Sequence, residues 1–213
     1  VGLPFADAPA GRRALWARVG VLSDEVSTTV LTSGLRPQGA AAAAAVRTRS
    51  ESGCESHLTL RDLQRVDRWV APGTVVWVCE NPRVLEAAMD AGARSAMVCT
   101  SGNPTLVVTL LLQSLAAAEA DLYYRGDFDW PGIAMANRIV AAYGASPWRM
   151  GAADYDAALE AAGASLLTLP LLEGAPVTAG WDAELTAAMV RAGRAVHEES
   201  LLELLVADVG DAR

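Results

Sequence analysis

The distribution of apolar and polar residues predicts alternating strands and helices through the middle of the chain. Three short apolar runs each lead, through a polar turn, into a longer stretch of helix-forming residues. The predicted strand and helix pairs are 74–79 with 82–91, 95–100 with 104–118, and 121–126 with 131–143. These strands are continuously apolar, which is typical of strands that helices cover on both faces. We therefore expect a parallel sheet with right-handed helical crossovers.

The regions on either side of this core are less regular. Before it, the expected elements are a short helix at 11–20, a strand at 28–32, a helix-forming alanine run at 40–45, a mobile loop at 48–56, and a strand leading into a helix at 57–63. After it, we expect a helix around 153–162 and two closing helices, the last around 195–208.

Three parts follow from this pattern, within an α/β, Rossmann-like fold class. Residues 1–71 form an N-terminal α/β segment, which we expect to continue an upstream domain. Residues 72–145 form the parallel-sheet core, with helices on both faces. Residues 146–213 form a C-terminal helical extension packed on that core.

Composition narrows the class of protein. With 213 residues, of which 52% are hydrophobic, the chain can bury a full core. It has no apolar run long enough to cross a membrane, and its first residues do not resemble a signal peptide. Cys54, Cys79 and Cys99 lack C-x-x-C spacing, so we expect no disulfide framework or structural zinc, which fits a reducing cytoplasm.

Charge excludes some ways of binding phosphates. All basic residues are arginines, and without lysine the chain cannot carry a P-loop. The net charge of −8 has the wrong sign for a module that holds nucleic acid by bulk electrostatics. A DNA substrate would have to be held by local arginines, by bound metal or by partner subunits.

Three acidic residues follow two of the predicted strands. Asp127 and Asp129 share one face of an extended chain, because side chains alternate there. Glu80 follows the strand at 74–79, and the carboxyl ends of parallel strands meet at one edge of a sheet. We expect the three carboxylates to hold a divalent cation, with Glu80 alternatively protonating a leaving 3′-oxygen. The simpler interpretation is that Glu80 and Asp129 cap helices and that Asp127 faces solvent.

Several weaker candidates surround these acids. The residues that could contact phosphates are Arg83, Gly102, Arg125 and Arg138, although each arginine could equally be solvated and Gly102 could belong to an ordinary turn. Arg125 is the strongest of the arginines, because alternation places it on the face of the two aspartates. His197 with Glu198 and Glu199 lacks the spacing of a known metal motif, and we interpret it as a helix face.

The order of these motifs resembles a known domain. V-C-E-N-P-R-V-L-E-A, C-T-S-G-N-P and Y-R-G-D-F-D-W-P-G each join a predicted strand to a helix, over roughly residues 72–145. This order resembles the Toprim domain of topoisomerases, bacterial primases and related nucleases. With the closing H-E-E-S-L-L-E-L-L, the chain also resembles the C-terminal domain of a bacterial family encoded beside SMC-like ATPases. Those operons resemble Wadjet anti-plasmid defence systems, whose nuclease subunit is similar to the topoisomerase VI A subunit.

The resemblance implies a function. Mg²⁺, or Mn²⁺ as a substitute, would be held by Glu80, Asp127 and Asp129 and would act on a phosphodiester of double-stranded plasmid DNA. The partners would be subunits of an SMC-like ATPase complex in a bacterial cytoplasm, with a homodimer left open. Topoisomerase VI-like proteins carry their nucleophilic tyrosine on a separate domain that is not recognisable here. The alternative is a non-catalytic docking subunit with a degenerate metal site.

Overall fold

The computed structural model describes residues 24–39 and 41–211, and the helix expected at 11–20 lies outside them. A six-stranded sheet, in the order β2-β1-β4-β3-β5-β6, forms its centre. The strands are β1 (Thr29–Ser33), β2 (Ser56–Thr59), β3 (Val75–Cys79), β4 (Ala96–Cys99), β5 (Asp121–Tyr124) and β6 (Ser146–Pro147).

The middle of the sheet is parallel, as the sequence predicts. β3 pairs in parallel with both β4 and β5, and β5 pairs in parallel with β6. On the other side, β1 is antiparallel to both β4 and β2. The N-terminal segment therefore adds two strands to the core sheet, and the extension adds β6 at the opposite edge.

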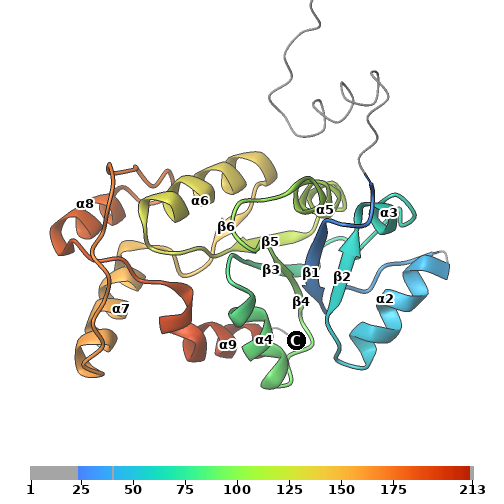
Figure 1. Cartoon of the computed structure of the whole chain (residues 1–213), viewed down its shortest axis with the longest axis horizontal. Helices are drawn as coiled ribbons and strands as arrows, with labels where there is room; N and C mark the ends of the chain where they lie inside the picture. The colour runs from blue at the N-terminus through green and yellow to red at the C-terminus, as the bar shows by residue number, and fades with distance from the viewer. Residues whose placement is uncertain (1–23, 40, 212–213) are drawn as a thin grey trace, which may run out of the picture.

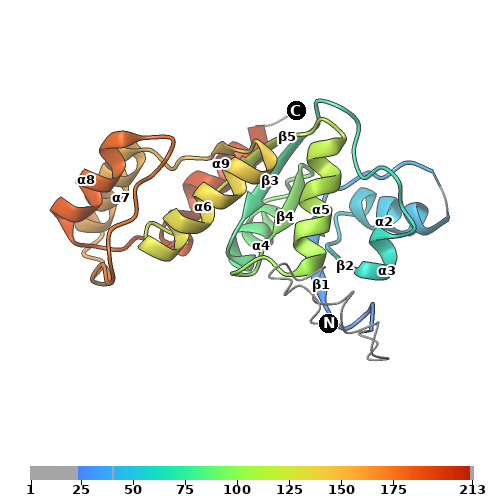
Figure 2. The ribbon, with the colours of Figure 1, turned by 90° about the horizontal axis from the view of Figure 1, so that it is seen from above.

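Helices cover both faces of the sheet (Figure 1). They are α2 (Ala41–Glu51), α3 (Leu60–Leu63), α4 (Pro82–Asp90), α5 (Leu106–Ala117), α6 (Trp130–Tyr143), α7 (Ala152–Ala164), α8 (Ala183–Ala192) and α9 (Leu202–Asp211), which follows the short 3₁₀ helix η1 (Glu198–Leu201). In Figure 1, α5 and α6 lie above the sheet and α4 and α9 below it. Figure 2 shows α7 and α8 together at the end of the molecule away from α2. No helix among residues 24–39 and 41–211 is long and apolar enough to cross a membrane.

Local sequence signals set the ends of the two helices nearest the acidic loops. The Asn81 side chain accepts the Arg83 amide and caps α4, with Pro82 in the first turn. The Asp129 side chain caps α6, which ends at Gly144 in a left-handed conformation. Both helices therefore begin directly after the acidic residues predicted to form the site.

The loop expected at 48–56 is shorter than predicted and covers only residues 52–55. α2 continues to Glu51, and β2 begins at Ser56. Ser50 is buried, and its hydroxyl donates to the Leu35 carbonyl at 2.6 Å. A tertiary contact thus extends a helix through residues whose polar composition is typical of a loop.

Gly132 holds the loop after β5 close to α6. A Cβ atom at this position would lie 2.3 Å from the Asp127 carbonyl oxygen and 3.0 Å from Asp129 Oδ1. The contact with the carbonyl oxygen is too short for any real side chain, so the backbone would have to move. Gly163, in α7, has open space around the same position.

We expect Gly132→Ala to destabilise the chain by roughly 1–3 kcal/mol, because it forces the loop away from the helix. Gly163→Ala is the matched control and should stabilise it by about 0.5–1 kcal/mol, since alanine favours a helix. Urea unfolding, monitored by circular dichroism, measures both changes. Equal effects of the two substitutions would contradict the close approach.

Candidate metal centre

The acidic loops lie at the carboxyl edge of the parallel strands. Glu80 directly follows β3, and Asp127 and Asp129 follow β5. A distant segment crosses this edge before η1: Phe128 and Val196 exchange backbone hydrogen bonds of 2.9 and 3.3 Å. The pairing brings the residues after Val196 against the loop that carries the two aspartates.

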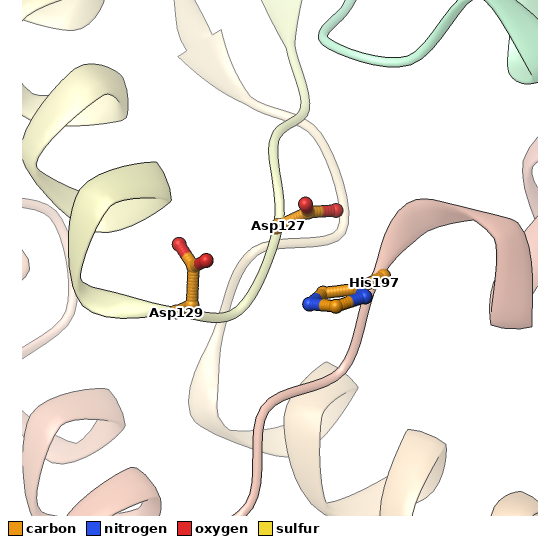
Figure 3. A group of neighbouring side chains, drawn as sticks. All are labelled: Asp127, Asp129 and His197. Carbon is orange, nitrogen blue, oxygen red and sulfur yellow. The ribbon is translucent and has the colours of Figure 1, made fainter. Parts of the chain in front are cut away.

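The structure brings Asp127 and Asp129 together with His197 (Figure 3). One ligand atom from each of these half-buried side chains lies within 4.8 Å of the others. Figure 3 shows the three side chains around a common space, two from the loop after β5 and one from the segment before η1. Two carboxylates and an imidazole at this spacing are a donor set for a divalent cation.

Backbone amides orient both aspartates. Asp127 Oδ1 accepts the Glu198 amide at 2.8 Å, and Asp129 Oδ1 accepts the Gly132 amide at 2.6 Å. Each carboxylate thus has one oxygen held by the protein. The capping role considered for Asp129 is therefore real, and it leaves the second oxygen of that carboxylate free of hydrogen bonds to the described residues.

Glu80 lies beside this group rather than within it. Among the described residues, the set with mutually close ligand atoms contains His197 and does not contain Glu80. Glu80 Oε2 is buried without a hydrogen-bond partner there and would lie 3.0 Å from a Cβ on Gly126. Burial raises the pKa of Glu80, and the charge of Asp127 raises it further.

The acidic edge brings several carboxylates close together in a partly buried place. Burial also raises the pKa of Asp127, although the Glu198 amide and the charge of His197 oppose the shift. A carboxyl group with a raised pKa binds its proton more tightly in the folded chain than in the unfolded one. Raising the pH from the unfolded-state pKa through the folded-state value therefore removes stability. A bound cation would offset that loss, because it stabilises the ionised carboxylates.

Glu198 is the residue that joins this edge to the C-terminal extension. Its side chain is 0% exposed and accepts the backbone amides of Glu80, at 3.2 Å, and of Asn81. Its own amide donates to Asp127. Burial raises the pKa of Glu198, and the charge of buried Arg125 opposes that rise. One residue thus contacts the loops after both β3 and β5.

Arg125 is not placed to contact a phosphate. It is 0% exposed, its guanidinium lies 4.4 Å from the centre of the Phe128 ring, and Nη1 donates to the Arg149 carbonyl. The prediction that it shares the face of the aspartates assumed a strand as far as residue 126, whereas β5 ends at Tyr124. Strand alternation does not apply beyond that point.

The other predicted phosphate contacts lie at the surface. Arg83 is exposed and forms an ion pair with Glu86 on α4. Arg138, on α6, donates from Nη2 to Asn103 Oδ1 at 3.3 Å, which ties α6 to the loop after β4. Gly102 adjoins Asn103, has a φ of +83°, and faces open space. Arg138 and Asn103 line a hollow of about 220 Å³, so these two residues remain accessible.

Sequence reasoning missed His197 and Glu198 as parts of this site. The segment was expected to be a helix face, but His197 and the residues before it are extended, and η1 begins only at Glu198. The available signal was two charged residues, Glu198 and Glu199, set between the apolar pairs 195–196 and 201–202. A buried acid requires polar partners, but the sequence does not name them.

We expect Glu198→Ala to destabilise the folded chain by roughly 3–5 kcal/mol, because it leaves two part-buried backbone amides without an acceptor and removes the negative charge that acts on buried Arg125. Glu199→Ala is the matched control, since Glu199 is exposed and its one hydrogen bond within residues 24–39 and 41–211 is to the Asn81 side chain. Chemical denaturation compares the two variants. Similar midpoints would contradict the structural role of Glu198.

Two family models match the chain. A model described as protein of unknown function N-terminus (DUF3323) matches residues 2–37. A second, described as protein of unknown function C-terminus (DUF2399), matches residues 56–209 and so includes every strand from β2 to β6 and the whole candidate site. No curated protein matches the chain. Because the second match spans more than two thirds of its length, the chain belongs to the DUF2399 family.

Proposed function

We propose that this chain is the metal-binding, Toprim-like part of a DNA nuclease that cleaves a phosphodiester with the help of a divalent cation. The observation that carries the proposal is the convergence of Asp127, Asp129 and His197 at the carboxyl edge of a parallel sheet, with Glu80 beside them. In open α/β sheets this edge is where ligands bind.

The residues present fit a hard divalent cation such as Mg²⁺ or Mn²⁺. Within residues 24–39 and 41–211, Asp127 and Asp129 each have one carboxylate oxygen that accepts no hydrogen bond. Oxygen ligands of this kind are the ones that Mg²⁺ and Mn²⁺ accept. When bound, the cation would neutralise phosphate charge and orient the attacking oxygen.

Glu80 has a different role from the two aspartates in this proposal. Burial is the largest cause of its raised pKa. Burial favours the neutral form of a carboxyl group, which is the form that a general acid needs. Glu80 would therefore protonate the leaving 3′-oxygen, while Asp127 and Asp129 hold the cation. This choice follows from Glu80 lying outside the group of mutually close ligand atoms.

DNA would approach from the side of α5 and α6. Arg138 and Asn103 line a hollow there, next to Gly102. The extension at 146–213 carries eleven acidic residues against four arginines, so it would repel a polyanion. The proposed setting is plasmid defence in a bacterial cytoplasm. There, SMC-like partner subunits would supply the remaining contacts to DNA.

The acidic extension also supports a second candidate, a docking subunit without catalysis. An excess of seven negative charges over this part of the chain suits a basic partner surface better than DNA. Its partner would again be a subunit of an SMC-like ATPase complex. This candidate requires no cleavage, and it leaves the metal site without a catalytic role.

The test is Mg²⁺- or Mn²⁺-dependent nicking of supercoiled plasmid DNA by the 213-residue chain. We expect Asp127→Asn and Asp129→Asn each to lower the nicking rate at least about 100-fold, because each removes a charged ligand. Asparagine still offers an acceptor to the amides of Glu198 and Gly132, so the fold should survive. Asp156→Ala, at an exposed position of α7, is the control and should cleave normally.

Two results would contradict the proposal that the chain is part of a nuclease. The first is nicking by both asparagine variants at the rate of the parent chain. The second is no nicking by the folded parent chain with either metal, together with tight binding to an SMC-like partner measured by calorimetry. That second result would favour the docking subunit.

A further inference from the structure

His197 is held in place by its two neighbours along the chain. Val196 exchanges two backbone hydrogen bonds with Phe128, and the Glu198 amide donates to Asp127 Oδ1. The residues on either side of His197 are therefore both bonded to the segment 127–129. Because Glu198 is itself buried and bonded to the loop after β3, the histidine backbone has little freedom to move.

The imidazole of His197 is close to the aspartates but is not paired with them. Its ligand atom lies within 4.8 Å of those of Asp127 and Asp129. No hydrogen bond or ion pair of 4.0 Å or less joins its ring to any residue in 24–39 or 41–211. Figure 3 shows the ring beside the space between the two carboxylates. A simple ion pair would close that space, whereas shared coordination of a cation would fill it.

The site is also open to solvent on one side. A hollow of about 340 Å³ adjoins it, lined by Asp129 and His197 together with Pro131, Pro170 and Glu173. A hydrated ion could enter through this hollow and keep waters on its open side. Glu173 adds a further negative charge to the entrance, which favours a cation there.

A nitrogen donor changes which metals such a site prefers. Mg²⁺ favours oxygen ligands and gives up its waters reluctantly, so an imidazole adds little to its binding. First-row transition dications accept imidazole readily, with affinity rising along the series from Mn²⁺ towards Cu²⁺. Two carboxylates with one imidazole therefore favour the transition metals over Mg²⁺, even though the carboxylates alone would accept either.

We propose that His197 is a direct metal ligand and that, through it, this site binds a first-row transition dication in preference to Mg²⁺. The inference rests on the metal-binding part of the proposed function and does not depend on DNA cleavage. As a ligand, His197 gives the segment before η1 a chemical role. The hydrogen bond from the neighbouring Glu198 amide to Asp127 holds that segment in place.

Mn²⁺ is the probe, because its unpaired electrons report directly coordinated nitrogen in pulsed electron paramagnetic resonance. We expect ¹⁴N coupling in the Mn²⁺-loaded chain and a ¹⁵N pattern after labelling histidine with ¹⁵N. His197→Ala should abolish the coupling and weaken Mn²⁺ binding at least about tenfold, with Mg²⁺ binding changing less than about threefold. His57→Ala is the matched control, since His57 is the only other histidine and is exposed on β2.

The labelled parent chain decides the proposal even if His197→Ala fails to fold. Absence of histidine nitrogen coupling in that chain would overturn it, and so would equal losses of Mn²⁺ and Mg²⁺ affinity in a folded variant. If histidine coordinates Mn²⁺ but the chain does not nick plasmid DNA, the nuclease proposal is wrong and the assignment of His197 as a ligand stands. Nicking that depends on the aspartates, in a chain without histidine coupling, would keep the nuclease and reject the inference.

Discussion

Buried Glu198 joins two loops that are far from it in sequence, one through its carboxylate and the other through its backbone amide. It accepts the amides of Glu80 and Asn81 after β3, while the amide of the same residue holds Asp127 after β5. This residue bonds to both acidic loops and so adds to the parallel pairing of β3 with β5 beneath them. The carboxyl edge of the sheet therefore depends on a segment that enters the site from the end of the chain. Burying an acid there is tolerated because backbone amides and Arg125 surround it.

This arrangement gathers negative charge at one place. Burial raises the pKa values of Glu80, Asp127 and Glu198, and repulsion among the acids contributes to each. Arg125 offsets part of that charge from the interior, on the side away from solvent. The partly exposed side, where Asp127, Asp129 and His197 meet, has no arginine among the described residues that form the cluster. A cation at that position would neutralise negative charge that the buried arginine does not offset.

Sequence reasoning was successful where the signals are local. The continuous apolar runs, the capping residues Asn81 and Asp129, and the helix-ending Gly144 all act within a few residues, so the parallel core could be predicted from them. The two aspartates were placed correctly at the sheet edge for the same reason. Sequence reasoning failed at Ser50, where packing overrides composition, and before Arg125, where the strand ends early. His197 could not be assigned because its partners lie about 70 residues away, and no spacing rule links them.

The proposed metal site requires one divalent ion shared by Asp127, Asp129 and His197. A crystal soaked in Mn²⁺ and measured at the manganese absorption edge would reveal such an ion. The structure predicts an anomalous peak in the space between these three side chains, at about 2.0–2.3 Å from their ligand atoms. A well-ordered crystal with no peak there, or with Mn²⁺ bound only at other acidic residues, would contradict the claim.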